Sequence, residues 1–591
     1  MKNHCHFFLL ILIFGCTNSI QVLNETFSSN PEVSEVELLS HIKYLSADER
    51  MGRFPGTKGS DETIQYIIKN FKANGVLPVG VDGFLQPFEF TTGIKVDNTT
   101  RLNIESNSVE LSKDFIPLEF SSNGKFEGKI AFVGYGFVID DSIKWNDYKG
   151  VDVDGKWVLI IRGAPGGVHP HSEFKDHLSL RKKSMIAKDK NALGVLFVNQ
   201  NGENELPKLK HSPNSLSIGI PVLQIKRNLA NELLSQKLND LQIKLDETNQ
   251  PQSFMLNKEV SAQVRLKRES IPISNVIGII PGKDPKLKKE YIILGAHFDH
   301  LGYGGEGTGS LAPDSKLIHN GADDNASGTA AILELASKLS INSNLLKRSV
   351  VVMGYNAEEE GLLGSKFFVN NPTIPLSSVV TMINLDMIGR MSNNTVTIGG
   401  TGTSNFFEPM LKEVNKSYNL KLAMSPEGFG PSDHASFYVN DIPVLFFFTG
   451  THSDYHKPSD DWSGINIEGQ KQITDFVYDI TMNLSKASQK PIFQESGPKQ
   501  SNQVRSSFKV TLGIMPSYGS DVKGLKIDGV RTNGPADIAG IEKGDIIISI
   551  KGKEVNNIYD YMYRLEELNT GEIIKIIILR NEEEIILSIN L

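Results

Sequence analysis

Between residues 270 and 485, hydrophobic residues form short continuous runs that alternate with segments of helical periodicity. Four of these runs end in polar or charged residues; they cover residues 291–300, 349–361, 378–389 and 442–456. Continuous apolar runs are typical of strands buried on both faces, and strands that alternate with helices favour a parallel arrangement. The pattern therefore predicts an α/β domain with a mainly parallel sheet flanked by helices.

The region before this domain has a different pattern in each of its two parts. Residues 33–46 and 62–75 have helical periodicity, and the second segment closes with Asn-Gly, a typical helix stop. Residues from about 115 to 250 instead contain short β-type runs around a single helical segment at 179–192. We therefore expect two helices followed by a separate β-rich unit.

The region after residue 485 begins with a polar segment, 486–506, which contains two prolines and is typical of a linker. Residues 507–591 then return to short strands and turns. The total length of 591 residues suggests about three to five domains, in keeping with this division.

The N-terminus has the pattern of an export signal. Lys2 provides a positive charge, and Phe7–Gly15 is an apolar run too short to span a membrane. Cys16 follows directly, as in a relaxed lipobox, so residues 1–15 are predicted to be a signal peptide and 16–33 a tether. The prediction is an exported protein, periplasmic or on the cell surface, held to the membrane only by a lipid on Cys16. An ordinary cleaved signal with an incidental cysteine is the alternative.

Charge and cysteine content exclude several other classes. The net charge of −8 argues against a protein that coats nucleic acid. The two cysteines, Cys5 and Cys16, cannot build a disulfide framework or a cysteine-ligated metal site in the mature protein.

Residues of metal-ligand type follow the four apolar runs. They are His297, Asp299, Glu358, Glu359, Glu360, Asp386 and His456. A further acid, Asp324, precedes a helical segment, and a helix N-terminus can hold a carboxylate in place. Parallel strands deliver residues at their carboxyl ends to one edge of the sheet. Each residue alone could be a capping or solvated group, but buried charges need a counter-cation. Two imidazoles and three carboxylates suit zinc, and five protein ligands can serve two ions if one carboxylate bridges.

Five sequence motifs resemble those of the two-zinc aminopeptidases, a family that also includes glutamate carboxypeptidases and glutaminyl cyclases. The motifs are His297-Phe298-Asp299, NGADDNASG, AEEEGLLGS, NLDMIGR and DYHKPSDD, in family order. The resemblance implies a zinc exopeptidase fold with two Zn²⁺ ions. It implies that His297, Asp386 and a bridging Asp324 hold one zinc, and that Glu359, His456 and Asp324 hold the other.

The same resemblance implies roles for residues that do not bind metal. Glu358 matches the general base, Asp299 matches an acid that orients a histidine ligand through its other ring nitrogen, and Tyr455 matches a tyrosine that hydrogen-bonds the oxyanion. Asp460, four residues after His456, is expected to orient that histidine. The implied reaction is hydrolysis of N-terminal residues from peptides by a zinc-bridging water.

Two further resemblances complete the division into domains. The region 115–255 resembles a protease-associated domain through its strand pattern and Gly134-Tyr135-Gly136, and NGPADIAGIEKGDIIISIKGKEV resembles a bacterial PDZ domain. Thr511–Ile514 is expected to be a carboxylate-binding loop for a C-terminal peptide ligand, on a domain that moves independently. The expected domains are residues 34–114 and 256–485 for the peptidase, 115–255 for the insert, and 507–591 for the PDZ domain.

Alternative functions depend on other sequence features. Gly302–Gly307 fits GxGxxG, but no helix follows, so a dinucleotide site is not expected; HExxH and GxSxG are absent. A carboxypeptidase or dipeptidase would need cations for a substrate carboxylate, and Arg390 and Lys457 are near the motifs, although both are expected to be solvated. A peptide-binding pseudo-enzyme is disfavoured by the intact ligands and base.

Overall fold

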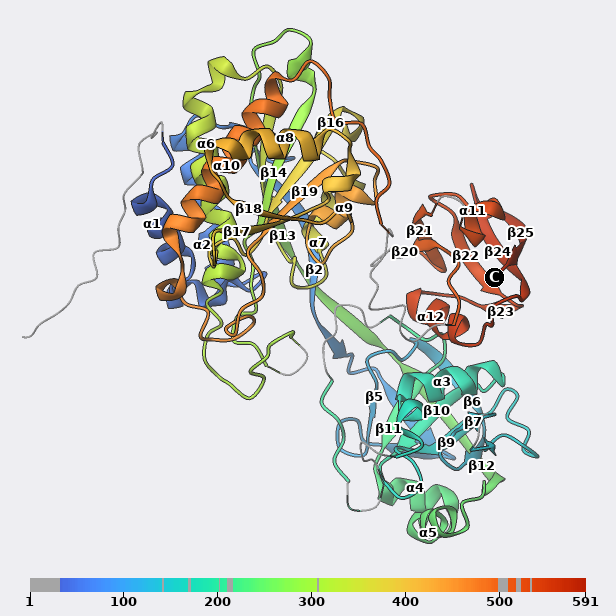
Figure 1. Ribbon diagram of the computed structural model, residues 1–591. Coiled ribbons are helices and arrows are strands. Elements are labelled where there is room, and N and C mark those ends of the chain that lie inside the picture. Colours follow the sequence, from blue (N-terminus) through green and yellow to red (C-terminus); the bar gives the residue numbers. More distant parts are fainter. Residues whose placement is uncertain are drawn as a thin grey trace, which may run out of the picture.

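The computed structural model describes residues 32–140, 143–167, 172–200, 202, 204–209, 216–305, 308–497, 509–516, 522–531 and 534–591. The predicted signal peptide, Cys16 and most of the expected tether lie outside these residues, as does part of the expected linker. Figure 1 shows the α/β domain that carries the predicted catalytic residues (the catalytic domain), a β-rich insert and a small C-terminal domain. Within the described residues, no helix combines the length and apolar character needed to cross a bilayer.

The catalytic domain is built on a nine-stranded mixed sheet, in the order β1-β13-β15-β14-β16-β19-β17-β18, with β2 paired to β13. The four central strands β15, β14, β16 and β19 are parallel, whereas β13 runs antiparallel to β15 and β17 runs antiparallel to β19. The strands are β1 (Leu77–Pro78), β2 (Leu85–Val96), β13 (Leu266–Ile280), β14 (Tyr291–His297), β15 (Ser349–Tyr355), β16 (Val379–Leu385), β17 (Thr395–Gly399), β18 (Lys421–Met424) and β19 (Val444–Phe448). The predicted α/β fold with a mainly parallel sheet is confirmed.

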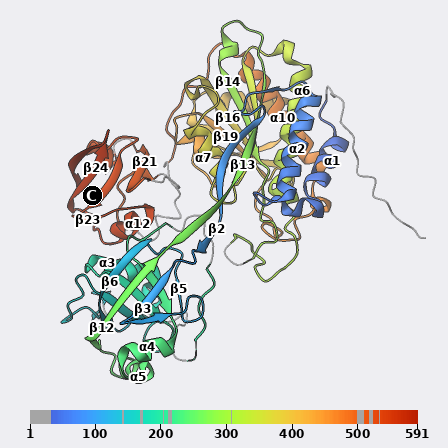
Figure 2. The ribbon, with the colours of Figure 1, turned by 180° about the vertical axis from the view of Figure 1, so that it is seen from behind.

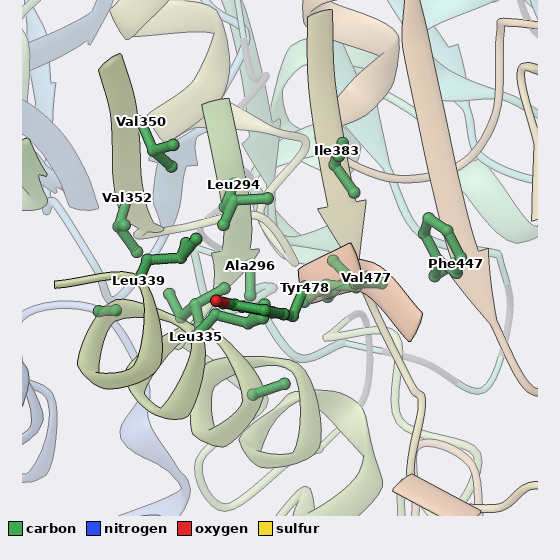
Figure 3. Packing of buried hydrophobic residues seen from close by; sticks show 14 of the residues in the cluster. Leu294, Ala296, Leu335, Leu339, Val350, Val352, Ile383, Phe447, Val477 and Tyr478 are labelled. Carbon is green, nitrogen blue, oxygen red and sulfur yellow. The ribbon is translucent and has the colours of Figure 1, made fainter. Parts of the chain in front are cut away.

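Helices cover both faces of this sheet because its central strands are apolar on both sides. One face packs against α2, α6, α8 and α10, and the other packs against α7 and α9. Figure 3 shows the first core, where Leu335 and Leu339 of α6 meet Leu294 and Val352 of the sheet. The helices are α1 (Glu35–Leu45), α2 (Lys58–Ala73), α6 (Gly328–Ile341), α7 (Leu363–Asn370), α8 (Phe407–Val414), α9 (His434–Tyr438) and α10 (Ile467–Lys486).

The insert has its own eight-stranded sheet, in the order β4-β3-β12-β6-β9-β10-β11-β5, and its own buried core. Its strands are β3 (Arg101–Ile104), β4 (Asn107–Val109), β5 (Phe115–Pro117), β6 (Gly124–Val133), β9 (Trp157–Ile161), β10 (Gly194–Val198), β11 (Val222–Ile225) and β12 (Ser253–Val264), beside the pair β7 (Val138–Ile139) and β8 (Trp145–Asn146). Its helices are α3 (Leu180–Asp189), α4 (Arg227–Leu234) and α5 (Leu238–Thr248). This sheet is wider than the expected range of 115–255, because β3 and β12 pair through residues 101–104 and 260–263.

A two-stranded ribbon joins the insert to the catalytic domain. β2 and β13 pair antiparallel from Leu85–Val276 to Val96–Leu266, and the end of β13 continues into the catalytic sheet beside β15. Figure 2 shows this ribbon running between the two bodies. The chain therefore enters and leaves the insert along neighbouring strands.

The C-terminal domain is a six-stranded antiparallel sheet, in the order β20-β21-β22-β24-β25, with β23 paired to β22. Its elements are β20 (Ile514–Pro516), β21 (Leu525–Val530), α11 (Pro535–Ile538), β22 (Ile546–Ile550), β23 (Lys553–Glu554), α12 (Ile558–Glu566), β24 (Ile573–Arg580) and β25 (Glu583–Asn590). Strand β20 lies at the edge of the sheet and follows Thr511–Gly513, the segment expected to hold a peptide carboxylate.

Candidate active site

The predicted metal ligands gather at the carboxyl ends of the four central parallel strands. His297 ends β14, Glu359 follows β15, Asp386 follows β16 and His456 follows β19. Asp324 lies in the helical turn before α6 and is 4% exposed. Parallel packing of β15, β14, β16 and β19 therefore brings together residues up to 159 positions apart in the sequence, His297 and His456.

The first cluster is formed by His297, Asp324 and Asp386. Nε2 of His297 lies 3.4 Å from Oδ1 of Asp324 and 3.4 Å from Oδ1 of Asp386. Burial lowers the pKa of His297, but the carboxylates of Glu358 and Asp386 outweigh burial and hold this pKa well above its usual range. The cluster therefore favours a positive charge at this position.

The second cluster shares Asp324. Nε2 of His456 lies 3.2 Å from Oδ2 of Asp324 and 3.2 Å from Oε2 of Glu359. Burial lowers the pKa of His456, but hydrogen bonds with Asp324 and Glu359 raise it to about 10. The two oxygens of Asp324 thus face two different histidines.

His300 was not singled out from the sequence, but it lies beside the second cluster. Its Nδ1 is 2.6 Å from Oε1 of Glu359 and 3.9 Å from Oδ2 of Asp324, and it is fully buried. His300, Asp324 and Glu359 could themselves hold an ion. Its position three residues after His297, just past the end of β14, was the available signal.

The spacing of these atoms fits zinc. Zinc bound to nitrogen and oxygen at 2.0–2.1 Å in a tetrahedron requires ligand atoms about 3.3–3.4 Å apart. The four histidine–carboxylate distances are 3.2–3.4 Å. Oδ1 of Asp386 is buried without a hydrogen-bond partner among the described residues, which is costly unless a cation satisfies it. The donors therefore suit two metal ions bridged by Asp324.

Glu358 points into the same site without belonging to either cluster. Its Oε2 is 3.9 Å from Nε2 of His297, and burial raises the pKa of Glu358 well above its usual range. The carboxylate of Asp299 accepts the backbone amides of Glu358 (3.0 Å) and Glu359 (3.3 Å). Nδ1 of His297 lies closer to the backbone carbonyl of Asp299, at 3.2 Å, than to the Asp299 carboxylate, at 3.8 Å. Asp299 therefore fixes the backbone that carries the base and its neighbouring ligand.

The expected role of Asp460 was wrong. Oδ2 of Asp460 accepts the backbone amides of Asp323 (3.0 Å) and Asp324 (3.1 Å), so it holds the bridging turn rather than His456. Nδ1 of His456 instead pairs with the carbonyl of Gly309 at 2.9 Å. The glycine-rich loop after β14 therefore supports a histidine ligand.

Tyr455 stacks on the ring of its neighbour His456, with the ring centroids 3.8 Å apart. Burial raises the pKa of Tyr455 above its usual value, so the hydroxyl keeps its proton at neutral pH. A protonated phenol at the edge of the site is able to donate a hydrogen bond.

A buried arginine from the N-terminal part supports both clusters. The side chain of Arg53 is fully buried and donates to the carbonyls of Phe298 (2.7 Å), Asn320 (2.7 Å) and Gly321 (2.8 Å), which flank the ligands His297 and Asp324. Burial lowers its pKa to about 10, so it remains charged at neutral pH. The sequence did not single out Arg53, because nothing local indicates contacts more than 240 positions away.

Asp433, which sequence analysis also missed, lies fully buried just before α9. Burial raises its pKa to about 7, and the surrounding charges include His297, Asp299 and Asp386. It therefore forms part of the electrostatic environment behind the first cluster.

The two candidate cations for a substrate carboxylate are already engaged. Nη2 of Arg390 lies 3.2 Å from Asp460 and 3.4 Å from Asp454. Nζ of Lys457 donates to the carbonyl of Ser453 (2.8 Å). Arg390 thus pairs with Asp460, the acid that holds the turn at Asp324, which corrects the expectation that Arg390 is a solvated surface charge.

Comparison with known families divides the chain in the same way as its three sheets. Residues 275–481 match peptidase family M28, residues 109–233 match the PA domain, and residues 503–591 match the PDZ domain. The residues of both ligand clusters and Glu358 all lie within the range that matches peptidase family M28.

The chain is also similar to individual proteins. The chain is 31% identical to leupeptin-inactivating enzyme 1 of Streptomyces exfoliatus over 188 residues, 31% of this chain and 37% of that protein. It is 27% identical to aminopeptidase YwaD of Bacillus subtilis over 357 residues, 58% of this chain and 65% of that protein. The chain thus spans less than two thirds of the length of both curated relatives. An aminopeptidase structure from Aneurinibacillus sp. strain AM-1 aligns with a TM-score of 0.43 and 21% identity, over 78% of this chain and 95% of that one.

Proposed function

We propose that the protein is an exported aminopeptidase that removes N-terminal residues from peptides and holds two zinc ions at the carboxyl edge of its catalytic sheet. The observation that supports this most strongly is the position of Asp324, whose two oxygens face His297 and His456 at 3.4 and 3.2 Å. A carboxylate in that position can bridge two ions. Asp386 and Glu359 complete the two ligand sets.

Zinc bound at these residues would supply Lewis acidity, which polarises a carbonyl and acidifies water. Glu358 is the proposed general base: it takes a proton from the attacking water and delivers it to the leaving amine as the peptide bond breaks. Asp299 holds the Glu358 backbone in place through its amide. Tyr455 would donate its hydroxyl proton in a hydrogen bond to the oxyanion.

The arrangement favours an aminopeptidase over a carboxypeptidase. A carboxypeptidase needs a free cation for the substrate carboxylate, but Arg390 is paired with Asp460 and Asp454. The carboxylates of Glu358 and Asp386 can instead receive a free α-amine. The site therefore offers carboxylates to a substrate amine, whereas its nearby arginine is already paired with acids.

A substrate screen tests this choice directly. The zinc-loaded protein should hydrolyse aminoacyl amides and should leave N-blocked peptides with free C-termini intact. Preference for the N-blocked peptides would instead support the carboxypeptidase or dipeptidase alternative. Zinc binding without hydrolysis of either class would support a peptide-binding protein.

Export and membrane attachment are also part of the proposal. The motivation is the apolar run Phe7–Gly15 followed by Cys16. Lipidation of Cys16 would place the protein at a membrane, and Cys16→Ser should release it into the soluble fraction. An unmodified, soluble wild-type mature protein would exclude the lipid anchor.

The edge strand β20 is the proposed site for a C-terminal peptide ligand.

A further inference from the structure

The insert and the C-terminal PDZ domain meet along two helices, α3 and α12, which lie side by side in Figures 1 and 2. At the centre, Arg564 of α12 donates from both terminal nitrogens to the carboxylate of Asp189 in α3, at 2.6 and 2.8 Å. The Arg564 side chain is 2% exposed and that of Asp189 is 13% exposed. Bidentate arginine–carboxylate pairs are among the strong hydrogen-bonded ion pairs that side chains make, and they fix the geometry of the two groups.

Complementary charges surround this central pair. Lys188 lies 3.5 Å from the buried carboxylate of Asp560, and Lys182 lies 3.0 Å from Glu566 at the rim. Both lysines belong to α3, whereas Asp560 and Glu566 belong to α12. The opposite signs on the two helices specify one relative orientation, because a shifted arrangement would oppose like charges.

Apolar and close backbone contacts complete the interface. Tyr563 of α12 packs against the hydrophobic core of the insert, and Leu216 of the insert packs against the core of the PDZ domain. Asn557 Nδ2 donates to the carbonyl of Ser217 at 2.8 Å. A Cβ atom at Gly219 of the insert would lie 3.7 Å from Nδ2 of Asn556 in the PDZ domain, so the two domains approach each other closely there.

The contact with the catalytic domain is of a different kind. Lys543 Nζ donates to Asn440 Oδ1 at 2.5 Å, at an exposed position. Such exposed contacts contribute little in water.

We propose that the α3–α12 interface is an intramolecular latch that makes the PDZ domain a fixed part of the insert. The PDZ domain then does not sample the space its linker allows, in contrast to the independent movement expected from the sequence. Its edge strand β20 is presented at a constant position relative to the insert, so any peptide bound there is also held at a constant position.

The test measures the distance distribution between the two domains in the full chain. Both native cysteines, Cys5 and Cys16, precede the domains, so after their replacement by serine fluorophores can be placed at exposed Lys237→Cys and Glu583→Cys. We expect one narrow distribution for the latched protein. Arg564→Asp or Asp189→Arg alone should broaden it. Because Lys553 of the PDZ domain also lies 3.2 Å from Asp189, the double swap is made together with Lys553→Gln, and it should narrow the distribution again. A label pair within the insert, Lys125→Cys with Lys237→Cys, is the matched control and should not change.

Each outcome decides the question. An unchanged distribution in both single variants would show that the pair does not hold the domains together. A double swap no better than the single variants would show that the charges do not act on one another. If either central variant fails to fold, reversal of the rim pair (Lys182→Glu, Glu566→Lys) gives the same comparison with a smaller broadening. Hydrolysis of a small aminoacyl substrate should stay within a few-fold in all variants, so the outcome is independent of the proposed zinc chemistry.

Discussion

Buried carboxylates have different surroundings in the catalytic domain and at the α3–α12 interface. At the interface, Asp189 and Asp560 face Arg564 and Lys188, so the chain neutralises its own charges. At the carboxyl edge of the catalytic sheet, carboxylates converge on two histidines whose pKa values they raise. The comparison teaches that a buried acid paired with a protein cation indicates architecture, whereas buried acids that crowd together indicate an external cation.

The largest expected effect comes from variants that distinguish the proposed base, Glu358, from the proposed metal ligand, Glu359. Glu358→Gln should retain zinc and lose about 10²–10⁴-fold in turnover, because Glu358 faces the site but belongs to neither ligand cluster. Glu359→Gln is the matched control one residue away, and it should lose metal. Metal analysis of both variants decides the assignment, and the opposite pattern of zinc loss would exchange the two roles.

Removal of metal should affect the two regions unequally. A chelator leaves the catalytic carboxylates uncompensated, so unfolding of the catalytic domain should move to lower temperature. Its unfolding free energy should fall by about 2.7 kcal/mol for an ion that was present at 100 times its dissociation constant. The insert and PDZ domain, whose charges pair internally, should unfold as before. Calorimetry with and without chelator measures both transitions, and equal shifts would contradict the contrast.

Arg53 tests whether support from behind the site matters for metal binding. Arg53→Met removes the donors to the carbonyls around His297 and Asp324, and outer-shell losses of this kind typically weaken metal affinity about 10–100-fold. Arg53→Lys should recover part of the affinity. Arg50→Met, three residues away and paired with Glu62 instead, is the control. Chelator competition measures the affinities, and wild-type affinity in Arg53→Met would refute the role.

Lys183 is a third kind of buried ionisable group, because its nearest contacts are carbonyls and aromatic rings. Nζ donates to the carbonyl of Gly163 (2.6 Å) and lies 4.3 Å from the ring centre of Phe137. Burial lowers the pKa of Lys183 from 10.5 to about 7. The unfolded chain then binds the extra proton between these values, so stability of the insert should rise with pH from about 7 to 10. The slope is at most about 1.4 kcal/mol per pH unit.

The variant Lys183→Met should lack this rise. Denaturant unfolding of both proteins at pH 7.5, 8.5 and 9.5 provides the comparison, and parallel pH profiles would show that Lys183 does not titrate in this range.

The smallest effect is expected at the rim of the α3–α12 interface. Glu566 is 39% exposed and pairs with Lys182, so Glu566→Gln should cost less than about 0.5 kcal/mol of unfolding free energy. Arg564→Gln, two residues away and buried, should cost several times more. Thermal unfolding of the two variants ranks them, and equal costs would mean that burial does not set the strength of these pairs.

Much of the candidate site was predictable because its residues follow strands with a strong local signal. His297, Asp386 and the Glu358-Glu359 pair each come directly after a continuous apolar run, and parallel strands place such residues at one edge. Arg53 and Asp433 were not predictable, because their contacts join distant segments and neither lies next to such a run. The partners of Asp460 were also missed, since four-residue spacing indicated His456 but tertiary packing directs it to the turn at Asp324.

The same distinction applies to the domains. The alternation of strands and helices predicted the catalytic sheet, and turn residues predicted the small C-terminal domain. The first strands of the insert were missed because 101–104 is short and pairs with a strand more than 150 residues later. Docking of α12 on α3 depends on charges 375 positions apart, which no periodicity reveals.

The paired strands β2 and β13 also determine how easily this architecture can be rearranged. Gly93 lies opposite Glu269, so the chain leaves for the insert and returns at adjacent points of one ribbon. Replacing everything between them by a two-residue Asn-Gly turn would convert the ribbon into a plain hairpin and leave the order of the catalytic strands unchanged. The insert is therefore an exchangeable cassette. Because the C-terminal domain packs against the insert, transferring the insert to another enzyme would require transferring both domains together.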